Sequence, residues 1–135
     1  MDLDRALSIS AAGMSAQSAR LRIVAENIAN RDSTGQSPGA EPYRRKTVSF
    51  GSRLDRSLGV QTVQVSRIGR DQRDFPERFE PGHPAADARG YVKTPNVDSL
   101  VENMDMREAN RSYSANLAVL ETTRGMLMRA IETLR

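Results

Sequence analysis

Residues 97–133 read VDSLVENMDMREANRSYSANLAVLETTRGMLMRAIET, and large apolar or aromatic side chains recur in this stretch every seven positions. The recurring positions are Met106, Tyr113, Leu120 and Leu127, and Leu134 continues them. An interval of seven keeps side chains on one side of an α-helix. The stretch therefore predicts a long helix over about 97–133 with an apolar seam.

A second series of positions, also seven apart, alternates with the first along the predicted helix. It consists of Asn110, Leu117, Arg124 and Ile131. Pro95 and Asn96 precede the helix, and asparagine is a favoured N-cap residue. We expect Asn96 to cap this helix, with Asp98 and Glu102 placing negative charge near the positive end of the helix dipole.

The N-terminal residues 1–30 repeat this pattern less strictly. Leu7, Met14, Leu21 and Ile28 recur at sevens, whereas Ile9 and Ile23 project from nearly the opposite side. Apolar side chains on two sides imply several packing neighbours. Asn30 begins a run of turn-forming residues, so we expect the first helix to end near it.

The segment between the helices, residues 31–95, predicts strands and long loops. Residues 45–50 alternate in polarity, and residues 60–68 are rich in β-branched side chains. Shorter extended pieces are expected at 77–80 and at 91–92, because proline, glycine and aspartate interrupt the chain between them.

These segments predict a mainly α protein with a small β-rich middle and an elongated shape. The expected divisions are an N-terminal helix (1–30), an irregular β-containing segment (31–95) and a C-terminal helix (96–135). The spacing alone allows two arrangements, an intramolecular helical hairpin or packing between chains. The second apolar side of the first helix favours a structural protein that assembles.

Residues suited to catalysis or metal binding are sparse. The chain has no cysteine, and its one histidine, His83, lies in a Pro-Gly-His-Pro loop. No glycine-rich phosphate-binding motif is present, and the basic run 44–46 is too short to favour nucleic-acid binding. We therefore expect no enzymatic activity, no metal, no cofactor and no nucleic-acid partner.

The sequence also carries no signal for membrane insertion or for general secretion. It has no run of about 18 apolar residues, so we expect no transmembrane segment. The first residues, MDLDRALS, have acids where a secretory leader carries basic residues.

Both ends of the chain resemble one protein family. Residues 15–34, SAQSARLRIVAENIANRDST, resemble the N-terminal motif of bacterial flagellar axial proteins, the family of rod, hook and junction proteins. Residues 90–126, GYVKTPNVDSLVENMDMREANRSYSANLAVLETTRGM, resemble the proximal rod members of that family. The residues that carry the resemblance are Asn27, Asn30, Gly90, Tyr91, Pro95, Asn96, Val97, Arg111, Tyr113 and Asn116.

The resemblance implies a structural subunit of the flagellar basal-body rod that supports motility. It implies export by the flagellar type III apparatus and assembly in the periplasm. The implied partners are copies of the chain and the rod proteins FlgB, FlgF, FlgG and FliE. The terminal helices would pair as a coiled coil lining the channel of the rod. Alternatives are another rod component such as FlgB, or a non-flagellar coiled-coil adaptor or export partner.

The residues expected to carry this role act by packing. They are Leu7, Met14, Leu21, Ile28, Met106, Tyr113, Leu117, Leu120, Leu127 and Ile131. Asn30 and Asn96 are expected to cap helix ends, and Asn27 to hydrogen-bond to another chain.

Overall fold

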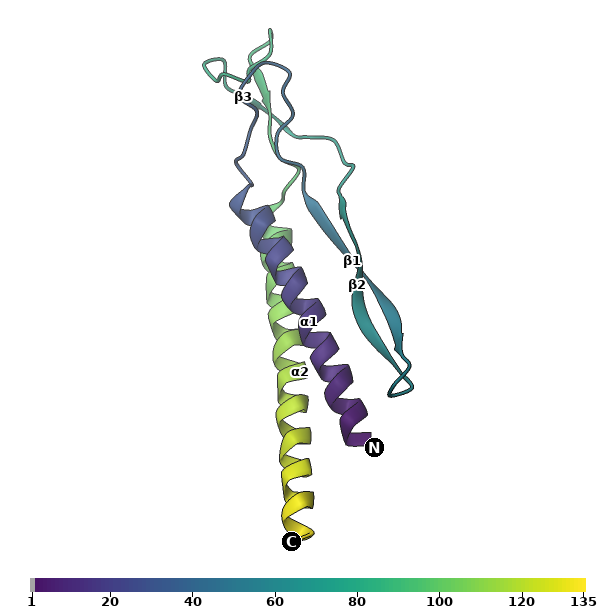
Figure 1. Ribbon diagram of the computed structural model, residues 1–135. Coiled ribbons are helices and arrows are strands. Elements are labelled where there is room, and N and C mark those ends of the chain that lie inside the picture. Colours follow the sequence, from purple (N-terminus) through teal and green to yellow (C-terminus); the bar gives the residue numbers. More distant parts are fainter. Residues whose placement is uncertain (1) are drawn as a thin grey trace.

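The computed structural model describes residues 2–135, and Figure 1 shows an elongated molecule of two helices and a β-hairpin. The helices lie side by side and run antiparallel, the hairpin lies along the first helix, and the remaining loops gather at one end (Figure 1). The elements are α1 (Asp2–Ala29), β1 (Lys46–Asp55), β2 (Val60–Arg70), β3 (Glu77–Phe79), β4 (Tyr91–Lys93) and α2 (Ser99–Thr133).

The first helix, α1, packs against α2 and also against the hairpin. Its 28 residues span about 42 Å at 1.5 Å per residue. Gly13 and several serines lower its intrinsic helix propensity. Contacts on two sides supply the stabilisation that the sequence of this helix lacks. The predicted helix over 1–30 is confirmed for the described residues.

The second helix, α2, begins two residues later than predicted, and its N-cap differs from the one expected. Asp98 is the N-cap, and its side chain accepts a hydrogen bond from the amide of Leu100. The prediction that Asn96 caps this helix is therefore wrong. Asn96 is instead buried and bonds to the two chain segments that flank the hairpin.

The 35-residue α2 is longer than α1, and its C-terminal end extends beyond the start of α1 (Figure 1). Residues 128–135 are all exposed. Leu134, the last member of the predicted heptad series, is 88% exposed.

The strands β1 and β2 form an antiparallel hairpin that is longer than the sequence predicts. Its register pairs Lys46 with Arg70 and Asp55 with Val60, with an irregularity between Ser49 and Phe50. The turn is closed by Asp55, whose carboxylate accepts hydrogen bonds from Ser57. The two predicted strands are confirmed, and each ends later in the chain than the predicted ranges 45–50 and 60–68.

The strands β3 and β4 form a second, very short antiparallel pair in the loop region. Phe79 and Tyr91 lie opposite each other and meet edge to face, with ring centroids 5.3 Å apart. Gly90 has a φ of 85°, and a Cβ there would lie 2.9 Å from the ring of Phe79. Both a left-handed backbone and a close approach therefore require glycine at this position.

The hydrophobic core is small for a chain of this length. Its buried apolar residues are Ala16, Ile23, Val24, Ala85, Val92 and Ala109. Buried polar residues are almost as numerous: Ser10, Asn27, Asn96, Glu102 and Thr123. Polar side chains therefore make up much of the buried interior.

Candidate subunit-packing face and polar junction

In α1, the residues that meet α2 recur every seven positions and are small or polar. Gly13 lies so close to α2 that an added Cβ would be 2.8 Å from the amide of Asn116. Seven residues on, Arg20 bonds to Asp105 at 2.8 Å, and seven further, Asn27 bonds to Glu102 at 3.3 Å. We call Gly13, Arg20 and Asn27 the contact line of α1.

The facing residues of α2 follow the same interval. They are Glu102, Ala109, Asn116 and Thr123. Glu102 and Ala109 are completely buried, Thr123 is buried and Asn116 is half-buried. These four residues form the contact line of α2. At these positions the two helices meet through a glycine, an alanine and polar side chains, and the buried Val24 lies on the same face of α1.

The residues one position before the contact line of α1 and those one position after it face different surfaces. Ala12, Ala19 and Glu26 precede it by one residue; the two alanines border hollows beneath the hairpin, and Glu26 bonds to Lys46 at 2.7 Å. The residues that follow it by one are Met14, Leu21 and Ile28. One residue is a rotation of about 100°, so these three point to the side of the helix pair away from the hairpin.

The predicted seam of α2 is also rotated away from its contact line, in the same rotational sense as in α1. Tyr113 and Leu120 stand three residues before Asn116 and Thr123, which is a rotation of about +60°. Because the helices are antiparallel, equal rotations bring both seams to the same side of the pair. We call this surface the apolar face, made of Leu7, Met14, Leu21, Ile28, Met106, Tyr113, Leu120 and Leu127.

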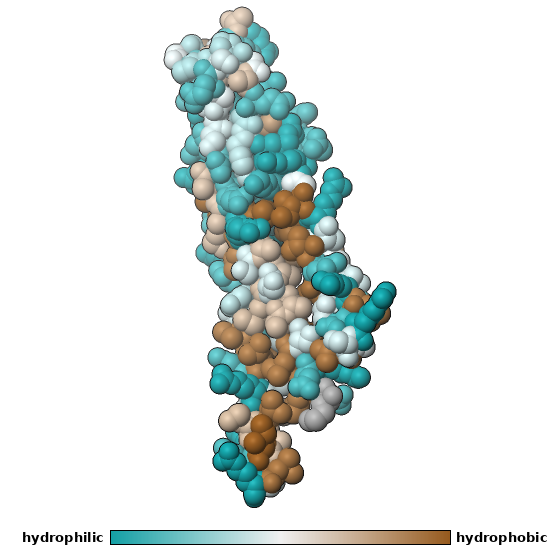
Figure 2. Space-filling model, viewed as in Figure 1, coloured by the Kyte–Doolittle hydropathy of each residue, from teal (hydrophilic) through white to brown (hydrophobic). Residues whose placement is uncertain are grey.

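All eight residues of the apolar face are half-buried. The two other predicted packing residues, Leu117 and Ile131, flank it and are 36% and 45% exposed. The predicted seams therefore do not meet each other along the centre of the helix contact; they adjoin and form one surface. In Figure 2 apolar side chains gather over the helical part of the molecule, whereas the loop end is hydrophilic.

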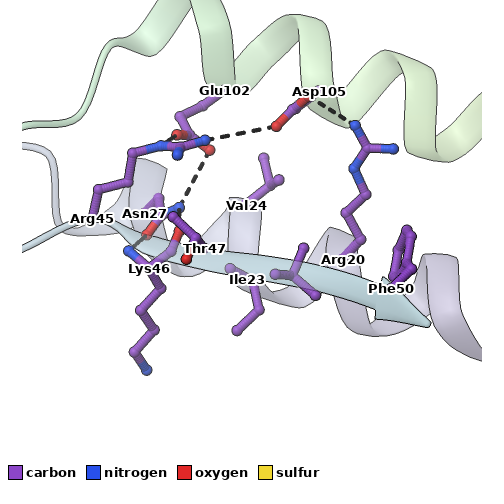
Figure 3. Close-up of a pocket in the computed structure, with 11 residues that line it drawn as sticks. Arg20, Ile23, Val24, Asn27, Arg45, Lys46, Thr47, Phe50, Glu102 and Asp105 are labelled. Atoms are coloured by element: carbon purple, nitrogen blue, oxygen red, sulfur yellow. Dashed lines mark hydrogen bonds and ion pairs between the residues drawn. The ribbon is translucent and has the colours of Figure 1, made fainter. Parts of the chain in front are cut away.

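A polar junction joins α1, α2 and β1 at one end of the helix pair (Figure 3). At its centre the Arg45 guanidinium bonds to the fully buried carboxylate of Glu102. Arg45 also lies 3.6 Å from Asp71 and 3.7 Å from Asp105. Arg20 pairs with the same Asp105, so cations and carboxylates alternate through the junction. A buried charge is tolerated only with such partners.

Hydrogen bonds shift the pKa values of groups around the junction. The bond from Arg73 holds the pKa of Asp71 below its usual value, and Arg45 adds to this effect. The bond from Lys46 lowers the pKa of Glu26. Burial raises the pKa of the Tyr43 hydroxyl, which donates to Asn27 at 2.7 Å.

Two asparagines of the family motif differ in how they meet expectation. Asn27 is 1% exposed and all its hydrogen-bonding capacity is used by Lys46, Glu102 and Tyr43, so the expectation that it bonds to another chain is wrong. Asn30 follows the last residue of α1 and donates to the carbonyl of Glu26 in its last turn, as expected of a residue that caps this helix end. Of the other motif residues, Gly90 and Pro95 are buried, Val97 is half-buried and Arg111 is exposed.

The histidine loop makes a structural contact. His83 Nε2 lies 3.1 Å from the Thr34 hydroxyl, and its Nδ1 accepts a hydrogen bond from the amide of Ala85. Among residues 2–135, no group of three or more histidine, aspartate or glutamate side chains is placed to hold a metal ion. None of the helices in this range has the length and apolar character needed to cross a membrane.

Comparison with known proteins matches both helices. The family model "Flagella basal body rod protein" matches residues 7–35, and "Flagellar basal body rod FlgEFG protein C-terminal" matches residues 88–133. The flagellar basal-body rod protein FlgC of Agrobacterium fabrum is 55% identical, over 98% of this chain and 96% of its own length. The chain belongs to the FlgC family of flagellar basal-body rod proteins.

More distant relatives in this family also match along nearly their whole length. FlgC of Salmonella typhimurium is 41% identical over 97% of each chain. FlgC of Bacillus subtilis is 38% identical over 93% of this chain and 94% of its own. The chain is thus a structural subunit of the basal-body rod, and the two regions matched by family models contain all eight residues of the apolar face.

Sequence reasoning identified the apolar face and missed the contact lines. Gly13, Arg20 and Asn27 share the interval of seven with Leu7 and its successors, but they carry no apolar side chain to mark it. The available signal was the second, polar series of sevens beside each apolar one. Arg45 and Asp71 could not be found in this way, because they reach the junction from outside the helices.

Proposed function

We propose that the apolar face is the surface through which this rod subunit packs against the terminal helices of its neighbours. The observation that supports the proposal is the position of the two seams on one side of the helix pair. Within one chain, α1 and α2 use their contact lines to meet each other, and the hairpin lies on a different side of α1. The apolar face is therefore available to a further helix.

The chemistry of the face fits a helical neighbour. Aliphatic side chains at intervals of seven pack into a facing helix as knobs into holes. Full burial of one large apolar side chain contributes about 1.5–3 kcal/mol. Covering the exposed part of eight half-buried residues would therefore contribute roughly 1 kcal/mol each. Such a sum suits a subunit that becomes rigid in an assembly.

The occupants we propose are helices of adjacent rod subunits, both copies of this chain and the rod proteins FlgB, FlgF, FlgG and FliE. In this arrangement the helices form coiled coils around the channel of the rod, and the segment of residues 31–95 lies outside them. We further propose that the chain reaches the periplasm through the flagellar type III apparatus, as its family implies.

Leu120→Asp tests the proposal. Leu120 is half-buried in the isolated chain, so the folded subunit keeps the new carboxylate partly in water. In the rod the same carboxylate would be buried without a partner, which is strongly unfavourable. We expect the variant to be folded by circular dichroism, absent from purified basal bodies and unable to restore swimming to cells lacking the native chain.

Ala118→Asp is the matched control. Ala118 is exposed and lies on the side of α2 opposite the contact line, so the same charge there leaves the apolar face unchanged. We expect it to support swimming. Normal swimming with Leu120→Asp, or equal loss with Ala118→Asp, would contradict the proposed packing face.

A further inference from the structure

The hairpin leaves the helix pair between two buried asparagine side chains. Asn27, on α1, accepts a hydrogen bond from the amide of Lys46 and donates one to its carbonyl, both at 2.9 Å. These are the two bonds that a neighbouring strand would make with this residue. The side-chain amide of Asn27 thus takes the place of a strand at the start of β1.

Asn96 bonds to the other side of the base of the hairpin, where the chain enters β1 and leaves β2. Its Oδ1 accepts from the amide of Arg45 at 2.8 Å. Its Nδ2 donates to the carbonyls of Asp71 at 3.0 Å and Arg73 at 3.1 Å. One side chain therefore links the segment that enters β1 to the segment that leaves β2.

Asparagine is the side chain that satisfies these partners. Asn27 is 1% exposed, and its other bonds run to the Tyr43 hydroxyl and to Glu102. Two donors and two acceptors are thereby all engaged, which is the full capacity of an amide. An aspartate would lack both donors, and an aliphatic residue would leave every partner buried and unbonded.

The rest of the hairpin contacts α1, but no residue of β1 or β2 is fully buried. An open hollow of about 290 Å³ lies between α1 and the hairpin around Ala16 and Val65, and one of about 650 Å³ lies near the hairpin tip beside Ser8. Leu54 is 50% exposed and Ile68 is 47% exposed. Close apolar packing along its length therefore does not fix the direction of this hairpin.

We infer that Asn27 and Asn96 are positioning residues that fix where the β-hairpin leaves the helix pair and how it lies along α1. The Arg45–Glu102 ion pair works with them. It holds Arg45, whose backbone amide bonds to Asn96 and whose neighbour Lys46 bonds to Asn27, against α2. The inference goes beyond the proposed packing face, since it concerns the placement of the hairpin in each subunit and involves no residue of that face.

The test measures two distances in the purified full-length chain by pulsed electron spin resonance. The chain has no cysteine, so paired substitutions carry the only spin labels. Ser57→Cys with Ala118→Cys reports the hairpin tip relative to α2, and Ala11→Cys with Ala118→Cys reports the helix pair. All three positions are exposed. The native sequence should give a narrow distribution for each pair.

Asn96→Leu should abolish the narrow hairpin distance and leave the helix-pair distance unchanged, because the bonds of this side chain run to Arg45, Asp71 and Arg73 and not to a helix. Asn27→Leu should also abolish the narrow hairpin distance. Asn30→Leu is the matched control, because Asn30 bonds only to Glu26 and Ser33 and not to the hairpin. It should leave both distances unchanged.

Three results would overturn the inference. An unchanged hairpin distance in both variants would show that other contacts place the hairpin. Loss of the helix-pair distance in Asn96→Leu as well would show that this asparagine holds the whole fold. A native hairpin distance distribution as broad as that of the variants would show that the bonds at the base of the hairpin do not fix the direction of the hairpin.

Discussion

The contact line of α1 and the apolar face beside it are one residue apart in sequence, yet their chemistry is opposite. Gly13, Arg20 and Asn27 are used inside the subunit, whereas Met14, Leu21 and Ile28 remain half-exposed. A monomeric two-helix protein would gain most by burying the leucines between its helices. This chain instead buries glycine, alanine, one valine and ion pairs there.

Under the proposed packing, one helix serves an internal and an external neighbour at once. Small and polar residues give a close, specific contact whose charges must be matched, so they define one register of α1 against α2. Large aliphatic residues contribute most when water is removed from around them. In the proposed assembly, keeping them outside the internal contact reserves that contribution for the neighbouring subunits.

The largest effect on the isolated chain is expected from Arg45→Ala. The variant leaves the buried Glu102 carboxylate without its closest cation, and removing one partner of a buried ion pair costs about 3–5 kcal/mol. Leu21→Ala, on the apolar face, should cost only about 1 kcal/mol, because part of that side chain is already exposed. Urea unfolding of the two variants gives the comparison.

The relative size of these two losses of stability decides whether the polar contacts, and not the apolar face, hold the isolated subunit together. In assembled rods Leu21→Ala should reduce incorporation far more than its effect on the isolated chain suggests. A larger loss of stability from Leu21→Ala than from Arg45→Ala in the isolated chain would show that the apolar face is already the core of the subunit.

Much of this fold could be predicted from the sequence, because its elements are long and periodic. Both helices, both hairpin strands and the two short strands lie where the patterns place them. The N-cap of α2 was misplaced, because Asn96 and Asp98 are both good capping residues and only the tertiary bonds of Asn96 decide between them.

The relation between the two seams could not be predicted. A helical pattern shows which side chains share one face of a helix, but it does not show which element packs against that face. Leu120 and Leu21 have the spacing of a seam whether they face each other or lie side by side. The deciding contacts are the close approach at Gly13 and the ion pairs of Arg20 and Arg45. Those contacts depend on residues that carry no hydrophobic signal.

Acidification should weaken the polar junction before it affects the apolar face. Asp71 has a folded-state pKa below its usual value of 3.8, chiefly because Arg73 donates to it. A carboxyl whose pKa is lowered by folding stabilises the fold above its unfolded-state pKa, and this contribution is lost as the pH falls through the folded-state value. We therefore expect the free energy of unfolding to decrease as the pH is lowered from 5 towards 2.

Asp71→Asn should reduce the acid-induced part of this loss, and the exposed neighbour Asp74 provides the control substitution Asp74→Asn. Thermal unfolding of the three chains between pH 7 and pH 2 measures the difference. Identical pH profiles for the native chain and Asp71→Asn would show that this carboxylate contributes nothing to the junction.

The smallest effect tests how close the contact line brings the two helices. Gly125, in α2, has open space where a Cβ would lie, so Gly125→Ala should stabilise the chain by about 1 kcal/mol through helix propensity. Gly13→Ala gains the same propensity, but its Cβ would displace the Asn116 amide from its bond to the Ser112 carbonyl. Overpacking of this kind costs about 1–3 kcal/mol, so the net change should be a loss.

Adding Asn116→Ala to Gly13→Ala separates the two contributions. Truncating Asn116 removes the clash, so the double variant should recover most of the propensity gain that Gly125→Ala shows alone. Non-additivity of this kind is the sign of a direct contact. Equal stabilisation by Gly13→Ala and Gly125→Ala, measured by thermal unfolding, would place the helices further apart at Gly13 and would leave the apolar face as their main contact.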